Sequence, residues 1–313
     1  MPAEEKTRLH PRNKNRERYD LEALKASSPG LKNFIKPNKF GAESIDFANP
    51  DAVRILNKAL LKHYYGINNW EFPKENLCPP IPGRADYLHY VADVLSDANN
   101  GKIPKGEKIT VLDVGMGSSC IYPIIGVVEY GWSFIGSDVD SKSVFSAQQI
   151  VDSNKALKSN VACKLQENKN FFFKSIIGTD SRIEFSISNP PFHASAKDAK
   201  NASRRKVKNL TGKKVESPVL NFSGISNELI YNGGEYKFIH DMIIESKKYA
   251  KNCLWFSSFV SNKNNLKGIT KTLAKVEAAK TKVISLGTGN KSSNIVLWSF
   301  LSEKEQLNWF KSK

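Results

Sequence analysis

A strand of apolar residues runs into a glycine turn at Val111-Leu112-Asp113-Val114-Gly115-Met116-Gly117-Ser118-Ser119, and apolar residues at helical spacing follow over 121–128. Glycines in such a turn let the backbone approach a ligand closely. About 20 residues further on, the next strand ends at Gly136-Ser137-Asp138, where a doubly wound fold places a carboxylate that accepts both ribose hydroxyls of a nucleoside cofactor. A tight structural turn is the alternative interpretation, but a strand, a helix and a second acidic strand end in register favour a cofactor site.

Short β-branched runs alternate with helical segments from Ile109 onward, which is typical of a parallel sheet covered by helices on both faces. The polar turn at 287–293 favours an antiparallel hairpin at the edge of this sheet. We therefore predict an α/β fold with a seven-stranded, Rossmann-like sheet. Its predicted strands cover residues 109–114, 133–138, 161–165, 183–188, 253–260, 280–286 and 294–301.

The glycine turn also indicates which cofactor it serves. The third glycine that a dinucleotide pyrophosphate requires is replaced here by Ser118 and Ser119. S-adenosylmethionine carries no phosphate, so the turn need only admit its methionine and adenosyl moieties past Gly115 and Gly117. We expect S-adenosylmethionine as the cofactor, and we include Asp113, in the strand that leads into the turn, in its predicted site.

A second motif, Asn189-Pro190-Pro191-Phe192, follows the apolar strand 183–188 at the same edge of the sheet. The prolines leave carbonyls without ladder partners, so the Asn189 side-chain oxygen and the Pro190 carbonyl can both accept from one NH2 group. Such bonding directs the nitrogen lone pair at a sulfonium methyl, while Phe192 can stack on a base. The motif predicts methyl transfer to an amine or amide, and by itself it permits adenine, cytosine, guanine or glutamine. Asn189 also counts as a cofactor-site residue because the motif lies beside the cofactor.

The net charge points to a polyanionic partner. Lys and Arg number 47 against 31 Asp and Glu, a formal net charge of +16, and such a field attracts nucleic acid. Basic residues are concentrated in 1–40 and in 193–215, the segment that leaves the catalytic motif. A solvated charged surface is the alternative, but proximity to the acceptor pocket favours contact with RNA phosphates. The predicted RNA contacts are Arg12, Lys14, Arg16, Arg18, Arg204, Arg205 and Lys206.

Residues 1–84 form a predicted basic, helical, RNA-guiding segment, and residues 85–313 form the predicted catalytic domain. Helical spacing and an Asn-Pro start predict a helix over 50–65. Four prolines between 73 and 82 predict a loop over 67–84, and a second amphipathic helix should run from about Arg84 to Ala98. Phe171-Phe172-Phe173 could form a stacking platform for bases, but a buried helix face is the favoured interpretation.

The four cysteines, at positions 78, 120, 163 and 253, form no C-x-x-C pair or Cys/His cluster, so neither zinc nor a disulfide framework is indicated. The N-terminus lacks an apolar signal stretch, and no run approaches the roughly 18 apolar residues that span a bilayer. We expect a cytosolic monomer that binds no metal and no membrane.

Seven segments carry a resemblance to a known family: Leu9-His10-Pro11-Arg12-Asn13, Arg18-Tyr19-Asp20, Ser44-Ile45-Asp46-Phe47-Ala48, Cys78-Pro79-Pro80-Ile81-Pro82-Gly83-Arg84-Ala85-Asp86-Tyr87, Gly115-Met116-Gly117-Ser118-Ser119-Cys120-Ile121-Tyr122-Pro123, Asn189-Pro190-Pro191-Phe192-His193 and Gly233-Gly234-Glu235. Over nearly its whole length the chain resembles the bacterial large-subunit (23S) ribosomal RNA adenine-N6-methyltransferase family. The eukaryotic relatives of that family methylate adenosine in U6 small nuclear RNA and in mRNA hairpins. The resemblance implies a class I methyltransferase fold.

The resemblance also implies roles for single residues. Arg84 would reach the cofactor's carboxylate, Gly115 and Ser119 would line its methionine end, and Asp138 would hold its ribose. Asn168 would contact the adenine ring, and residues 189–192 would form the acceptor pocket. The expected reaction is methyl transfer to adenosine N6 in large-subunit ribosomal RNA, either naked or in a pre-ribosomal particle. The rival hypotheses are a methyltransferase that acts on DNA adenine or protein glutamine, and a non-catalytic RNA-binding protein of the same fold.

Overall fold

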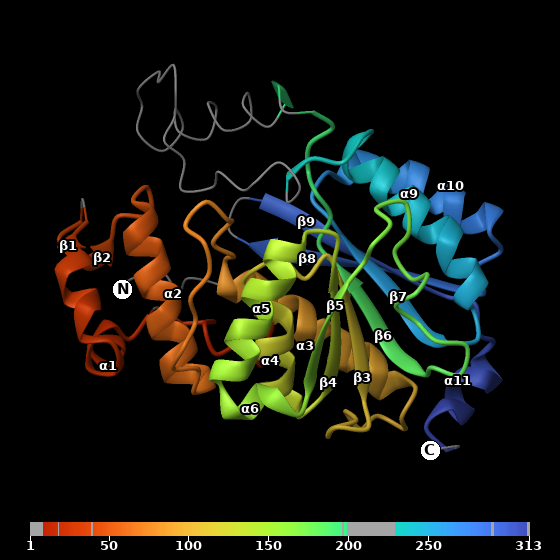
Figure 1. Ribbon diagram of the computed structural model, residues 1–313, viewed down its shortest axis with the longest axis horizontal. Coiled ribbons are helices and arrows are strands. Elements are labelled where there is room, and N and C mark those ends of the chain that lie inside the picture. Colours follow the sequence, from red (N-terminus) through yellow and green to blue (C-terminus); the bar gives the residue numbers. More distant parts are fainter. Residues whose placement is uncertain are drawn as a thin grey trace, which may run out of the picture.

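The computed structural model describes residues 9–17, 19–38, 40–195, 197–198, 229–288 and 291–311, and a β-sheet forms its centre (Figure 1). Within these residues the sheet has seven strands in the order β5-β4-β3-β6-β7-β9-β8. The first five in this order are parallel, whereas β9 runs antiparallel to both of its neighbours. The strands are β3 (Thr110–Val114), β4 (Ser133–Asp138), β5 (Val161–Leu165), β6 (Ile183–Ser188), β7 (Cys253–Val260), β8 (Lys280–Thr288) and β9 (Lys291–Ser299). The predicted α/β fold and its terminal hairpin are thereby confirmed.

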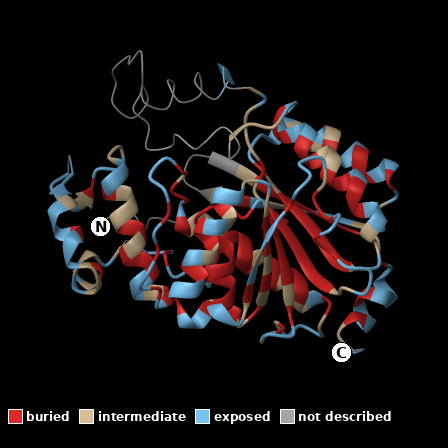
Figure 2. Ribbon diagram, in the orientation of Figure 1, coloured by how far each residue is buried: buried red, intermediate tan, exposed pale blue. Residues whose placement is uncertain are grey.

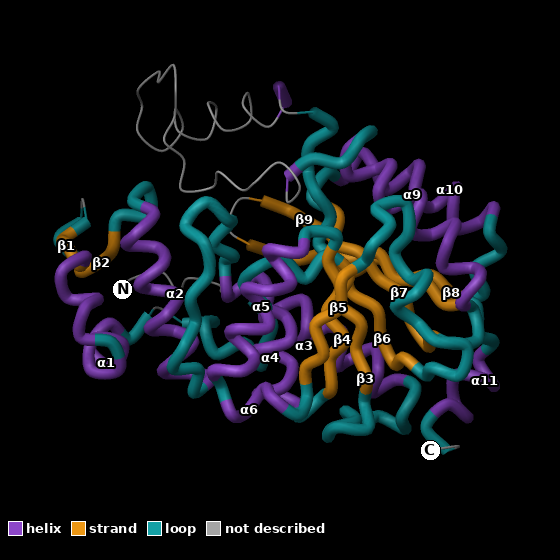
Figure 3. Tube along the Cα trace, in the orientation of Figure 1, coloured by secondary structure: helices purple, strands orange, loops and turns teal. Residues whose placement is uncertain are grey.

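Helices cover both faces of the sheet (Figure 3). Successive side chains of a strand point to opposite faces, and in β3 Val111 joins one apolar core while Leu112 joins the other. This explains why the central strands are buried along almost their whole length (Figure 2). The first core is covered by α3 (Ile81–Asp97), α4 (Ile121–Tyr130), α5 (Ser141–Ser153) and α6 (Lys155–Lys158), and the second by α9 (Gly234–Ser246) and α10 (Leu266–Lys275). The short η2 (Lys247–Tyr249) and η3 (Lys263–Asn265) flank β7, and α11 (Glu303–Trp309) ends the fold.

The N-terminal segment lies beside the sheet as a separate group of small elements (Figure 1). It contains α1 (Leu21–Ser27), η1 (Pro29–Phe34), β1 (Ile35–Pro37), β2 (Glu43–Ile45) and α2 (Pro50–Tyr65). Asn49 caps α2 by accepting from the backbone N–H groups of Asp51 and Ala52. The predicted helix over 50–65 is confirmed. Buried side chains such as Leu24 and Leu60 belong to the same apolar core as Trp132 of the sheet domain.

Two local predictions differ from the structure. The expected loop over 67–84 ends at Pro80, because Pro82 occupies the first turn of α3, where a missing backbone N–H costs no hydrogen bond. The boundary predicted between residues 84 and 85 therefore falls inside this helix. Phe172 and Phe173 are buried as predicted, but they lie in an irregular segment that crosses the second core and not on a helix.

The described residues also bear on the expectations for membrane spans, metal sites and disulfides. Within the described ranges, no helix is both long and apolar enough to cross a bilayer. In the same ranges, His, Cys, Asp and Glu side chains do not gather in groups of three or more that could hold a metal ion. All four cysteines are free thiols.

Candidate active site

A cavity of about 2210 Å³ opens at the carboxyl ends of β3, β4 and β6. Drug-sized ligands usually occupy roughly 300–1,000 Å³, so this cavity has room for a nucleoside cofactor and a second nucleotide. The strand order β4-β3-β6 places the chain reversal of the doubly wound sheet at this edge, where such folds bind ligands. The N-terminal segment supplies the opposite wall. Its contribution includes Arg16, Phe40, Phe47 and Asn57.

The glycine turn after β3 faces open space in this cavity. Gly115 and Gly117 have φ angles of +77° and +68°, a left-handed conformation that glycine adopts without strain. A Cβ atom built on either residue would meet nothing within 4 Å. A Cβ on Gly136 of β4 would lie 2.1 Å from the Met116 sulfur, so this third glycine lets the turn pack closely against β4. The turn is therefore a cradle that a ligand can enter.

Asp138 stands at the end of β4 beside the turn. One carboxylate oxygen accepts from the Gly117 N–H at 2.9 Å and the other from the Asp140 N–H at 2.9 Å. Burial raises the pKa of Asp138, and the two backbone donors act against that rise. Each carboxylate oxygen can accept more than one hydrogen bond. Asp138 is thus positioned on the cavity wall to accept further donors such as ribose hydroxyls.

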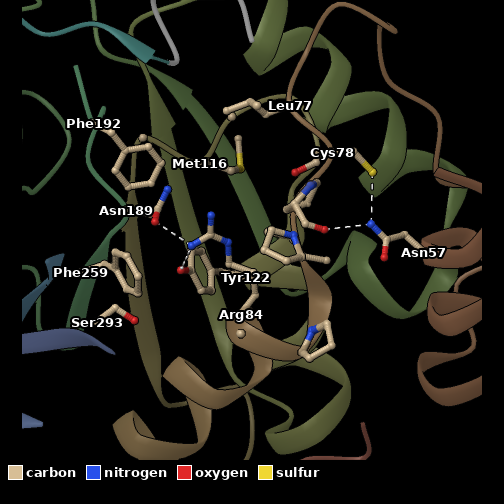
Figure 4. Close-up of a pocket in the computed structure, with 18 of the residues that line it drawn as sticks. Asn57, Leu77, Cys78, Arg84, Met116, Tyr122, Asn189, Phe192, Phe259 and Ser293 are labelled. Atoms are coloured by element: carbon tan, nitrogen blue, oxygen red, sulfur yellow. Dashed lines mark hydrogen bonds between the residues drawn. The ribbon is translucent and has the colours of Figure 1, made fainter. Parts of the chain in front are cut away.

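The Asn-Pro-Pro-Phe motif follows β6 on the other side of β3. The Ser188 hydroxyl donates to the Val114 carbonyl at 2.9 Å and ties the ends of the two strands together. Asn189, Pro191 and Phe192 line the cavity, whereas the Pro190 side chain is buried and is not part of the lining. The Phe192 and Phe259 side chains lie on the same side of the close-up as Asn189 (Figure 4). A planar base that enters here would have an amide oxygen and aromatic rings within reach.

Arg84 links the Asn-Pro-Pro-Phe motif to α4, the helix that follows the glycine turn. From the first turn of α3 its Nη1 donates to the Asn189 side-chain oxygen at 2.6 Å and to the Tyr122 hydroxyl at 3.0 Å (Figure 4). Its guanidinium also lies 5.4 Å from the centre of the Tyr122 ring. Burial raises the pKa of Tyr122 to about 12, although Arg84 lowers it, so the hydroxyl is neutral at physiological pH. Tyr122 lies in the first turn of α4, and its contact with Arg84 was not expected from the sequence.

Two of the predicted cofactor residues lie off the cavity wall. Asp113 is fully buried behind the turn, and among the described residues its carboxylate oxygens have no hydrogen-bond partner. Burial raises the pKa of Asp113 to about 8, with Arg84 lowering and Asp138 raising it. Asn168 is exposed, and its side-chain oxygen accepts from the Asn170 N–H at 3.0 Å. Gln166, to which the sequence assigned no role, lines the cavity instead, and Ser119 lines it too.

The predicted RNA contacts are distributed unevenly. Arg16 lines the cavity. Arg12 donates to Asp93 and to the His89 carbonyl, each at 2.7 Å, and Lys14 lies 2.9 Å from Glu129. Both of these side chains therefore bridge the N-terminal segment to the sheet domain. Outside the described residues lie Arg18, Arg204, Arg205 and Lys206.

Comparisons with known proteins agree with this geometry. A protein named ribosomal RNA large subunit methyltransferase F, from Flavobacterium johnsoniae, is 51% identical over 307 residues, which cover 97% of each chain. The catalytic domain of human METTL16, solved in complex with hairpin 1 of the MAT2A 3′UTR, is 26% identical with a TM-score of 0.79 over 94% of this chain and 96% of that one. The N-terminal domain of human METTL16 in complex with SAH is 25% identical, with a TM-score of 0.73 over 94% and 99%.

A family described as RNA methyltransferase matches residues 3–302. That match covers both the N-terminal segment and the whole sheet. The fold, the glycine turn and the acceptor motif thus have one common interpretation, and the chain belongs to the RNA methyltransferase family.

Proposed function

We propose that the protein transfers a methyl group from S-adenosylmethionine to the N6 amine of an adenosine in large-subunit ribosomal RNA. The observation that carries this proposal is the position of the Asn189 side chain, which lines the same cavity as the open glycine turn of the adjacent strand. The name of the bacterial relative favours ribosomal RNA over DNA adenine or protein glutamine as the substrate. We also propose that the protein acts as a monomer in the cytosol.

The residues present fit this cofactor. The open cradle at Gly115 and Gly117 accepts its methionine end, and the cationic Arg84 on the same wall suits its carboxylate. Asp138 would hold the ribose hydroxyls, and we retain Ser119, Asn168 and Asp113 as proposed members of the site. When bound, the cofactor supplies an electrophilic methyl group on sulfur.

The chain itself orients the amine. The Asn189 side-chain oxygen and the Pro190 carbonyl would accept the two N6 hydrogens, which directs the nitrogen lone pair toward the methyl donor. Phe192 would stack on the adenine ring. No strong base is required before transfer, because the methylated nitrogen becomes acidic and loses its proton to water.

The RNA would approach through the N-terminal wall. Arg16 lines the cavity, and we propose that it contacts phosphates together with Arg18, Arg204, Arg205 and Lys206. We propose that Arg12 and Lys14 also contact RNA. Both side chains additionally form ion pairs with acids of the sheet domain, which hold the N-terminal segment in place. A pre-ribosomal particle is an equally suitable partner because its exposed RNA presents the same phosphates.

Mass-spectrometric mapping of methyladenosine tests the proposal. Large-subunit ribosomal RNA from source cells with and without the protein should differ by one N6-methyladenosine. Purified protein should restore that methyl group on RNA from the deficient cells, and it should leave DNA and protein unmethylated in parallel reactions. Equal methylation in both cell types, or preferential methylation of DNA or glutamine, would reject the proposed substrate.

A further inference from the structure

Two parts of the reaction place competing demands on Arg84. Its Nη1 lies 2.6 Å from the Asn189 side-chain oxygen, which is the atom that has to accept a hydrogen of the adenine amine. The same guanidinium is the cation that suits the cofactor's carboxylate. One side chain therefore contacts the acceptor pocket in this structure and is also needed at the cofactor.

A cation on the Asn189 oxygen opposes the reaction. An amide oxygen has two lone pairs, and Arg84 occupies one of them with a short, charge-assisted bond. Positive charge develops on N6 while the methyl group is transferred. A guanidinium that shares the same oxygen acceptor would repel this charge.

We propose that Arg84 changes partners when the cofactor binds: its guanidinium leaves the Asn189 side-chain oxygen for the cofactor's carboxylate, and the freed oxygen becomes the acceptor for the adenine amine. This inference rests on the proposed function, because it requires both the cofactor and the amine. It makes Arg84 a positioning residue that couples occupancy of the two halves of the cavity.

The surroundings of Arg84 are suited to such an exchange. The residue sits on the first turn of a rigid helix, and its long side chain reaches Tyr122 as well as Asn189. The Tyr122 hydroxyl gives the guanidinium a second hydrogen bond at 3.0 Å that does not depend on Asn189. A carboxylate binds a guanidinium through two parallel bonds, which are stronger than one bond to a neutral amide. The exchange therefore favours the cofactor-bound arrangement.

Reciprocal coupling follows from this exchange. If the cofactor frees Asn189 for the amine, binding of the amine must strengthen binding of the cofactor by the same factor. Each ligand therefore binds more tightly to the protein when the other is present.

The decisive test uses cofactor binding alone. S-adenosylhomocysteine has the carboxylate, whereas 5′-methylthioadenosine has the same adenosyl thioether without the amino acid. Because Asn189→Ala removes the bond that Arg84 has to leave, it should tighten S-adenosylhomocysteine binding about fivefold, the value of one net hydrogen bond. Its affinity for 5′-methylthioadenosine should not change. Isothermal titration calorimetry measures both ligands on the whole protein.

Arg84→Met provides the control. It should weaken S-adenosylhomocysteine binding, and adding Asn189→Ala to it should produce no further change, which completes a double-mutant cycle. Equal or weaker S-adenosylhomocysteine binding by the folded Asn189→Ala protein overturns the exchange. Tightening that persists in the Arg84→Met background, or that extends to 5′-methylthioadenosine, overturns it as well. Wild-type protein that binds no S-adenosylhomocysteine rejects the proposed function itself, which separates the two failures.

Discussion

The sheet edge and the N-terminal segment form opposite walls of one cavity, but they are held in place by different interactions. At the sheet edge, strand order and backbone hydrogen bonds position the turn, since the Gly115 and Met116 N–H groups both donate to the Ser137 carbonyl. The N-terminal segment is held in place by side-chain hydrogen bonds and ion pairs to residues that are distant in sequence. Asn13, for example, donates to the Pro82 carbonyl and to Asp86.

The two walls also differ in what their basic side chains contact. Beside the sheet edge, the cationic side chain of Arg84 in α3 lines the cavity. In the N-terminal segment, Arg12 and Lys14 are paired with Asp93 and Glu129 across the interface with the sheet domain. A high local density of basic residues therefore does not identify which of them contact RNA, because some of them form ion pairs that hold the segment against the sheet domain.

The largest expected effect comes from comparing two asparagine variants, one in the acceptor motif and one in the N-terminal segment. Asn189→Ala should lower turnover by at least about 10³-fold, because it removes an acceptor that orients the amine, while cofactor affinity changes only a few-fold. Methyl incorporation into ribosomal RNA under single-turnover conditions measures this.

Asn13→Ala is the matched variant in the N-terminal segment, where the buried Asn13 does not line the cavity. It leaves the buried Asp86 with one donor fewer, so it should lower the unfolding free energy by about 1–3 kcal/mol and leave the turnover of the folded protein largely intact. Normal turnover in Asn189→Ala would contradict the assignment of chemistry to the sheet edge.

Asp138 tests cofactor binding at the sheet edge. Asp138→Ala should weaken S-adenosylhomocysteine binding by about 2–4 kcal/mol, counting two charge-assisted hydrogen bonds partly replaced by water. The exposed Asp152, which accepts from Gln148 within α5, is the control, and Asp152→Ala should bind normally. Near-normal affinity in Asp138→Ala, measured by calorimetry, would place the ribose elsewhere.

The sequence predicted the sheet edge well because its rules are local. Short β-branched runs between helical segments indicate the strands, a parallel sheet brings their carboxyl ends to one edge, and the two motifs follow those ends directly. The bounds of β4, β5, β6 and β7 agree with the predicted ranges. Asp138, Asn189 and the two turn glycines accordingly lie together.

The side-chain partners could not be predicted, because they depend on packing between distant segments. Arg84 meets Asn189 across 105 positions, and Arg12 meets Asp93 across 81. The motif predicts that Asp113 contacts the cofactor. Its side chain is instead fully buried, because successive side chains of β3 point to opposite faces of the sheet. A single sequence specifies such pairings only through the finished tertiary structure.

The two regions should also differ in how pH affects stability. Burial raises the pKa of Asp113 to about 8, above the value of about 3.9 in an unfolded chain. Its contribution to stability is therefore complete below about pH 4 and is lost as the pH rises toward 8. The slope approaches 1.4 kcal/mol per pH unit, or about 2–3 kcal/mol between pH 5 and pH 7. Asp113→Asn should flatten this slope in urea unfolding.

Asp93 behaves in the opposite way. Burial acts against its charge, but hydrogen bonds from His10 and Arg12 outweigh burial and hold the pKa of Asp93 below its ordinary value. Its contribution is present above about pH 4 and is lost as the pH falls through the lowered pKa. Asp93→Asn should therefore leave the slope between pH 5 and pH 7 unchanged and flatten the profile only in acid. Identical profiles for the two variants would contradict the distinction.

The smallest effect distinguishes the two tasks of arginine in the N-terminal segment. Arg12 bonds to Asp93 and to the His89 carbonyl, so Arg12→Ala should lower the unfolding free energy by about 1 kcal/mol, a value reduced by its partial exposure. If Arg16 neutralises one phosphate, Arg16→Ala should reduce the slope of log affinity against log salt by about 0.7 for single-stranded RNA. Salt titrations of RNA binding, together with urea unfolding, measure both quantities on both variants. If Arg12→Ala flattens the salt slope as much as Arg16→Ala does, Arg12 also contacts phosphate, and pairing with Asp93 does not exclude a cation from the RNA path.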